Sequence, residues 1–268
     1  MPAKRVAKTV NVLGAMKFIR LLPSCFLSLA LLAMMDLRAE TESANDELPP
    51  PHTAYYHLYK GIVVLAKTRR TFRVAKNNHY IFMSYTEPTG VGRMLTGATI
   101  KERSYWTLKD NYPKPLEYSY VNSGGDKDRD VKLIFDWEQN KVTNIINGDP
   151  WTMDLVPRIQ DKLLYQFSLM LELKKGVTQF SYDVADGGKL KNYSGKVVGH
   201  DVVETDLGKF DTVVVLREHD GKQTRFWCAK SMHFIPVQIE QINREGSSVT
   251  AKLYEIKGVK IPVFNESE

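Results

Sequence analysis

The residue types that most often do chemistry are present in this sequence, but they do not form catalytic or metal-binding patterns. The six histidines are spread along the chain, at His52, His57, His79, His200, His219 and His233. None belongs to an H-E-x-x-H motif or to a pair on the predicted helix, whereas a catalytic zinc site needs three protein ligands at fixed geometry. The sequence also contains no G-x-S-x-G motif, phosphate loop or dinucleotide-binding glycine pattern. We therefore expect no catalytic residue, no metal and no cofactor.

Carboxylates near the centre of the chain offer the remaining route to catalysis. Asp149, Asp154 and Asp161 lie close to the predicted helix, and two acids held ~5–9.5 Å apart can hydrolyse a glycan. Roles in turns and at a helix start also explain these residues. A second acidic group, at residues 126–130, alternates with basic residues and lacks the glutamate of a calcium loop, so it predicts a solvated hairpin tip.

The aromatic residues carry a stronger functional signal. The chain has 4 Trp, 13 Tyr and 11 Phe, and many lie in predicted strands, where alternate positions share one face of a sheet. Residues 213–216 are apolar on both faces, which predicts either a strand covered on both sides or one that lines an apolar cavity. Ordinary core packing is the alternative explanation for the aromatic residues. The candidate ligand-binding residues are Trp106, Tyr118, Tyr120, Trp137, Phe167, Val213, Val215 and Trp227.

Strands must position these residues, since turn signals recur about every ten residues from Tyr55 onward. Asn77-Asn78 and Asp220-Gly221 are typical of tight hairpin turns. The sequence predicts a mainly β fold, an antiparallel meander that forms a curved sheet, an open half-barrel or a β-sandwich. One amphipathic helix, at about residues 158–174, begins after Pro157, ends before Gly176 and packs on the sheet.

The N-terminal region is typical of an export signal. Residues 1–39 contain a basic start, an apolar run of about fifteen residues and Ala39 at a cleavage position, with Met16 as an alternative start. We expect a disordered, proline-rich spacer at 40–54, a single β domain at 55–260 and a tail at 261–268. Cleavage would remove Cys25 and leave Cys228 as a buried, inert thiol, with no transmembrane span in the mature protein.

The net charge of +6 comes almost entirely from this N-terminal segment. Six of the 37 basic residues and one of the 31 acidic residues lie in residues 1–39, so the remainder carries 31 basic and 30 acidic residues. A nearly neutral domain has no electrostatic reason to bind phosphate backbones. We therefore exclude nucleic acid as a partner.

Several short segments together resemble a known family. They are residues 55–62, Gln160-Asp161 and residues 206–213, 226–229 and 235–239. In order and spacing the sequence resembles a domain-of-unknown-function family of exported β-rich proteins from Gram-negative bacteria. That family is similar in architecture to the LolA/LolB-type periplasmic lipoprotein carriers, whose open half-barrel holds acyl chains against covering helices. Only one helix is evident here, where those carriers have several.

The resemblance implies a periplasmic, metal-free and non-enzymatic binding protein. With the aromatic strands, it predicts an apolar or amphiphilic ligand, such as a lipid, a lipoprotein or an envelope intermediate. The first alternative is a structural or adaptor protein that binds an envelope protein through a sheet edge or the tip at 123–130. The second is a glycan or cell-wall hydrolase. The oligomeric state and the closure of the sheet stay open.

Overall fold

A computed structural model describes residues 48–95, 97–125 and 127–261. The predicted signal peptide at 1–39 and residues 262–268 of the predicted tail lie outside the described residues. The folded domain begins earlier than the predicted residue 55, because Leu48 is buried and the first strand starts at His52.

The described chain forms fifteen strands, most of them joined by short turns. They are β1 (His52–Lys60), β2 (Val63–Val74), β3 (His79–Pro88), β4 (Thr99–Lys109), β5 (Tyr112–Ser123), β6 (Arg129–Asp136), β7 (Lys141–Ile146), β8 (Asp149–Asp154), β9 (Gln160–Asp161), β10 (Gln179–Asp186), β11 (Lys189–Thr205), β12 (Gly208–His219), β13 (Lys222–Ala229), β14 (Ile235–Ile242) and β15 (Ser248–Lys257). The helical elements are α2 (Gly92–Leu95), α3 (Tyr165–Lys174) and a 3-10 turn at Lys230–Met232.

All fifteen strands belong to one sheet, in the order β8-β7-β6-β5-β4-β3-β2-β1-β15-β14-β13-β12-β11-β10-β9. The N-terminal half is a meander from β1 to the edge strand β8, and the C-terminal half is a second meander from β10 to β15. The two halves join where β1 pairs antiparallel with β15. The predicted open, curved, antiparallel sheet is confirmed, with one parallel pair between β9 and β10.

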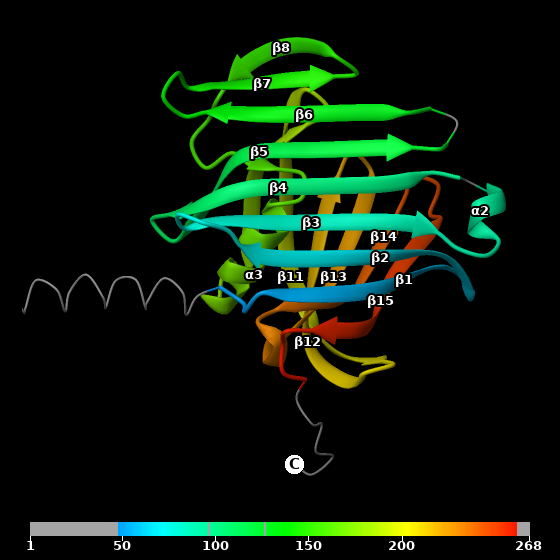
Figure 1. Ribbon diagram of the computed structural model, residues 1–268. Helices are drawn as coiled ribbons and strands as arrows, with labels where there is room; N and C mark the ends of the chain where they lie inside the picture. Colours follow the sequence, from blue (N-terminus) through cyan, green and yellow to red (C-terminus); the bar gives the residue numbers. More distant parts are fainter. Residues whose placement is uncertain (1–47, 96, 126, 262–268) are drawn as a thin grey trace, which may run out of the picture. The chain divides into compact units, whose positions relative to one another are not determined.

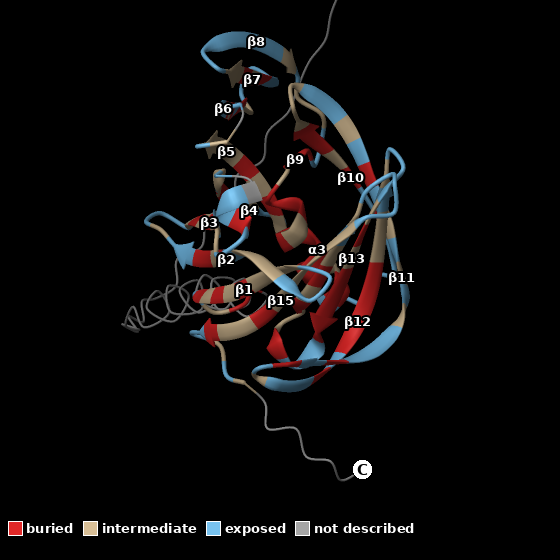
Figure 2. Ribbon diagram, turned by 90° about the vertical axis from the view of Figure 1, so that its right-hand side faces the viewer, coloured by how far each residue is buried: buried red, intermediate tan, exposed pale blue. Residues whose placement is uncertain are grey.

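The sheet curves so that its two halves face each other across α3. Figure 1 shows β1–β8 as a front layer, with α3 and strands β11–β13 behind it. In the side view of Figure 2, α3 lies between the N-terminal strands and the C-terminal strands. The face of β1–β5 that is turned away from α3 is called the outer face below.

Local sequence explains the hairpin turns. Asn77 and Asn78 both adopt positive φ angles, 57° and 54°, as the predicted tight turn between β2 and β3 requires. Asp220 and Gly221 do the same between β12 and β13, at 51° and 69°. Both predicted hairpins are therefore confirmed.

The central helix is confirmed, but it is shorter and more buried than its sequence pattern predicts. It begins at Tyr165 rather than near residue 158, because Gln160 and Asp161 pair with β10 as strand β9. Side chains on all sides of α3 are buried, since both halves of the sheet contact it. The sequence predicts a helix with a single apolar stripe. In the structure α3 is instead enclosed on nearly every side.

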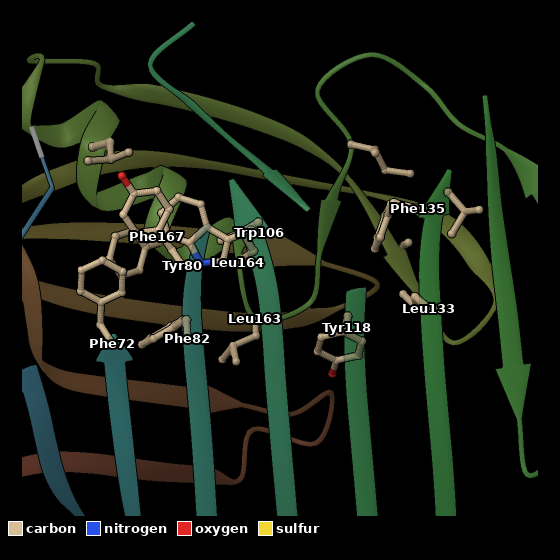
Figure 3. Packing of buried hydrophobic residues seen from close by; sticks show 14 of the residues in the cluster. Phe72, Tyr80, Phe82, Trp106, Tyr118, Leu133, Phe135, Leu163, Leu164 and Phe167 are labelled. Carbon is tan, nitrogen blue, oxygen red and sulfur yellow. The ribbon is translucent and has the colours of Figure 1, made fainter. Parts of the chain in front are cut away.

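Three apolar clusters fill the space around α3. Figure 3 shows the first, in which Phe167 and Leu164 lie beside Trp106 and Tyr80 of the N-terminal half. The second and third clusters join Met170 and Leu169 of α3 to the C-terminal strands. None of the helices in the described ranges is long and apolar enough to cross a membrane.

Candidate functional site

A concave feature of the described surface lies on the outer face of β1–β5. It is an open hollow of about 650 Å³. Strand register explains its lining, because every second residue of each strand faces outward and outward residues of paired strands stand side by side. Two neighbouring cross-strand rows form the hollow: Tyr55–Arg69–Tyr85–Lys101–Val121 and Thr53–Thr71–Met83–Arg103–Ser119.

Side-chain size explains why this part of the sheet is concave. Thr53, Thr71 and Ser119 are the short side chains of the second row, two at one end and one at the other, and the hydroxyl oxygens of the two threonines lie 3.3 Å apart. The longer side chains of Tyr55, Arg69 and other residues of the two rows surround them. Short side chains beside long ones leave a depression, which we call the basic hollow.

The basic hollow is rich in cations that have few acidic neighbours. Arg69, Arg73, Lys101 and Arg103 line it. Of these four, only Arg103 has a carboxylate within ion-pair distance in the part of the chain that the structure describes, with its Nη1 3.3 Å from Glu117 Oε1. The hollow therefore presents an excess of positive charge to solvent.

Tyr85 organises two of these cations. The Arg69 guanidinium lies 5.6 Å from the centre of the Tyr85 ring, and the Lys101 ammonium lies 5.9 Å from it on the neighbouring strand. Such cation–π contacts hold the charged groups over an aromatic face while leaving their N–H donors available. The arrangement suits a ligand that combines an anionic group with an apolar part, for which Met83 and Val121 offer contact.

Glu102 also borders the basic hollow, but its carboxylate belongs to the interior face. Its Oε1 accepts a hydrogen bond of 2.7 Å from the hydroxyl of Tyr118, a buried residue. Burial, followed by the charge of Glu102, raises the pKa of the Tyr118 hydroxyl well above its usual range. Because of this contact, the Glu102 carboxylate points away from the cations of the basic hollow.

The eight candidate residues from the sequence are buried or partly buried and fall into three groups. Trp106, Tyr118 and Phe167 belong to the first apolar cluster, and Tyr120 and Trp137 pack against it. Val213 and Val215 belong to the third cluster, and Trp227 to the second. Direct contact joins Trp106 to Phe167, whose ring centroids lie 5.3 Å apart. Ligand contact by these eight residues stays a prediction.

Asp161 has a structural role that its position near the helix suggested. Its carboxylate accepts hydrogen bonds from the backbone N–H groups of Leu163 and Leu164, at 2.8 and 2.7 Å, and so caps the turn that leads into α3. The Ser104 hydroxyl donates a third bond of 2.5 Å. Burial raises the pKa of the Asp161 carboxyl to about 7, although these three hydrogen bonds act in the opposite direction.

The other carboxylates from the sequence analysis are on the surface. Asp149 and Asp154 are exposed on β8, where Lys141 donates a hydrogen bond of 2.6 Å to Asp154. Asp128 accepts a hydrogen bond from the Gly124 N–H within the tip between β5 and β6. Within the described ranges, no group of three or more His, Cys, Asp or Glu side chains is placed to hold a metal ion.

The basic hollow was not predicted from the sequence, although a signal for it was present. Arg69, Arg73, Lys101 and Arg103 stand at even spacing within two strands, so each pair shares a face. Alternation alone places both pairs on the solvent side. Their convergence depends on the pairing of β2, β3 and β4, which short-range patterns do not specify.

Comparisons with known proteins agree with the fold. The model of a family described as protein of unknown function (DUF3108) matches residues 53–254, which include every residue of the basic hollow. A beta-barrel-like protein of domain of unknown function DUF1849 from Brucella abortus is similar in structure, with a TM-score of 0.52 and 12% sequence identity. The alignment covers 80% of this chain and 99% of that one. At this identity the likeness shows the fold alone.

A second solved structure gives a weaker match. It is described as a "putative lipoprotein" from Parabacteroides distasonis, with a TM-score of 0.30 and 10% identity over 79% of this chain and 98% of that chain. No curated protein matches the sequence at a significant level.

Proposed function

The chain belongs to the family of proteins of unknown function DUF3108, and from this premise we propose that it is a non-enzymatic periplasmic binding protein for an anionic amphiphile. The basic hollow on the outer face of β1–β5 is the proposed site. The single observation that carries the proposal is the cluster of four cations around an open hollow of about 650 Å³. Ligand sites of small molecules typically measure ~300–1,000 Å³.

The chemistry of the lining supports an amphiphile rather than a simple anion. Arg69 and Lys101 flank Tyr85 and offer N–H donors to a phosphate or carboxylate group. Met83 and Val121 offer apolar contact in the same rows. A ligand with a charged head and a hydrocarbon tail satisfies both parts of the hollow at once.

The sequence pattern at residues 1–39 supports a periplasmic location. It combines a basic start, an apolar run too short to span a bilayer as a helix, and a small residue at the cleavage position. Export would place the basic hollow in the compartment where envelope lipids and their intermediates pass between membranes.

Lipid analysis of the purified protein tests the proposal. The full chain is expressed in a Gram-negative host and purified without detergent, and its extracted lipids are identified by mass spectrometry. We expect an anionic amphiphile in the wild type, much less of it in Arg69→Gln/Lys101→Gln, and the wild-type amount in Lys189→Gln/Lys222→Gln. The last variant removes two exposed cations of the C-terminal half. Equal amounts in all three proteins, or none in the wild type, would contradict the proposal.

An adaptor function is the second candidate, and the open edge at β8 favours it. This strand pairs with β7 on one side only, and Trp151 in it is 40% exposed. An exposed sheet edge can add a strand from a partner. A photo-crosslinking residue in place of Trp151 tests this function: one stoichiometric protein adduct supports it, and the absence of adducts contradicts it.

A further inference from the structure

An exposed apolar tip lies at one end of the N-terminal half of the sheet. The turn between β1 and β2 contributes Ile62, which is 96% exposed, and Val63. The loop between β3 and β4 contributes Met94 of α2, which is 89% exposed, and Val91. We call these four residues the apolar tip. Figure 1 shows α2 and the β1–β2 turn at the same end of the front layer.

Backbone contacts hold the two parts of the apolar tip together. The N–H of Thr89 donates a hydrogen bond of 2.8 Å to the carbonyl of Leu65, which joins the α2 loop to β2. Gly92, the first residue of α2, lies so close to Leu65 that an added Cβ would stand 1.8 Å from the Leu65 carbonyl oxygen. Only glycine permits this approach, so α2 is fixed beside β2 with Met94 turned outward.

Exposure of this degree needs an explanation, because the two large apolar side chains contact almost nothing in the described chain. Gly61, at a φ of 58°, makes the turn that presents Ile62. Single exposed apolar residues are common, but two nearly bare ones on adjacent protruding loops are typical of an interaction site. A bilayer accommodates exposed apolar side chains directly, whereas a protein partner would need a matching pocket.

Charge identifies the kind of bilayer. Lys60 precedes the β1–β2 turn and Arg93 stands between Val91 and Met94, and both side chains are exposed. Arg93 is held near the loop by a hydrogen bond of 3.2 Å from its Nε to the Pro88 carbonyl. Apolar side chains flanked by cations match the order of hydrocarbon and anionic headgroups at a membrane surface.

We propose that the apolar tip docks the protein on an anionic lipid bilayer, with Ile62 and Met94 inserted and Lys60 and Arg93 at the headgroups. The inference goes beyond the binding of a single amphiphile and rests on residues outside the basic hollow. Docking would place the end of the N-terminal half that carries α2 and the β1–β2 turn against the membrane surface.

Vesicle flotation tests docking. The probes are vesicles of phosphatidylglycerol and phosphatidylethanolamine, with phosphatidylcholine vesicles for comparison. We expect the wild type to float with the anionic vesicles and Ile62→Ser/Met94→Ser to bind them at least about tenfold more weakly, since two apolar side chains no longer insert. Lys60→Gln/Arg93→Gln should weaken binding to anionic vesicles by about fivefold per charge.

Matched variants separate docking from other effects. Leu190→Ser/Val202→Ser removes two exposed apolar side chains elsewhere and should float as the wild type does. Arg69→Gln/Lys101→Gln should also float. Loss of amphiphile binding at the basic hollow would therefore not be mistaken for loss of membrane docking by the apolar tip. Wild-type protein that stays at the bottom of the gradient, or an Ile62→Ser/Met94→Ser variant that floats equally well, would overturn the proposal.

Discussion

Phe167 of α3 lies against Trp106 of β4, with ring centroids 5.3 Å apart and both side chains fully buried. Phe72 of β2 completes the contact, at 4.7 Å from Phe167. Both Trp106 and Phe167 are candidate ligand-binding residues from the sequence, and in the structure their rings contact each other. The helix therefore fills part of the interior beside the N-terminal strands.

Truncation of Phe167 tests how tightly this interior is packed. Phe167→Ala removes a ring from a closed cluster and should lower the free energy of unfolding by about 3–5 kcal/mol. Urea denaturation measures the change, and Met94→Ala, at an exposed position, should change stability by about 0.5 kcal/mol or less. A loss below about 1 kcal/mol for Phe167→Ala would indicate a loosely filled interior and would favour a ligand site there.

The sequence predicted the strands, the two hairpins and the presence of a central helix because these depend on local patterns. The Asn77-Asn78 and Asp220-Gly221 turns need only residues that tolerate positive φ angles. The start of α3 was misplaced because Ile159 and Leu163 continue a helical spacing, whereas β9 forms through pairing with the distant β10. Long-range pairing of this kind has no local signature.

The same limit applies to the candidate site. Sequence analysis selected large aromatic residues, and the structure shows that most of them pack the core. The basic hollow instead depends on which outward residues become neighbours: Arg69 and Lys101 meet over Tyr85 only because β2, β3 and β4 pair in this register. The short helix α2 was also missed, since four residues give no periodic pattern.

The pH dependence of stability should report the buried Asp161. Its carboxyl has a pKa raised by burial to about 7, against a usual value of 3.8. Between these values the unfolded chain releases the proton and the folded chain keeps it, so stability falls as the pH rises toward 7 and changes little above. From pH 5 to pH 8 this group should remove roughly 2–3 kcal/mol of stability.

Asp161→Asn isolates this contribution. Asparagine keeps an oxygen acceptor for the Leu163 and Leu164 amides but carries no charge. Urea unfolding at pH 5 and pH 8 should therefore show a smaller loss of stability in the variant than in the wild type. Parallel pH profiles for the two proteins would mean that Asp161 does not titrate as proposed.

Cys228 should be inert in the folded protein. The thiol is fully buried, and burial raises its pKa, so little reactive thiolate forms at neutral pH. In a Cys25→Ser background, Ellman's reagent at pH 8 should label the native protein only as fast as it unfolds. Ser231→Cys, at an exposed position, should react within the mixing time. Rapid labelling of Cys228 in native protein would show an opening near β13 that the packing does not predict.

The central claim is that the basic hollow binds an anionic amphiphile, and calorimetric titration with dodecyl phosphate below its micelle concentration tests it most directly. The account predicts saturable binding at one site, weakened at least about tenfold in Arg69→Gln/Lys101→Gln, unchanged in Lys189→Gln/Lys222→Gln, and absent with dodecyltrimethylammonium. Equal affinity for the anionic and cationic amphiphiles, or equal binding by the wild type and the Arg69→Gln/Lys101→Gln variant, would contradict it.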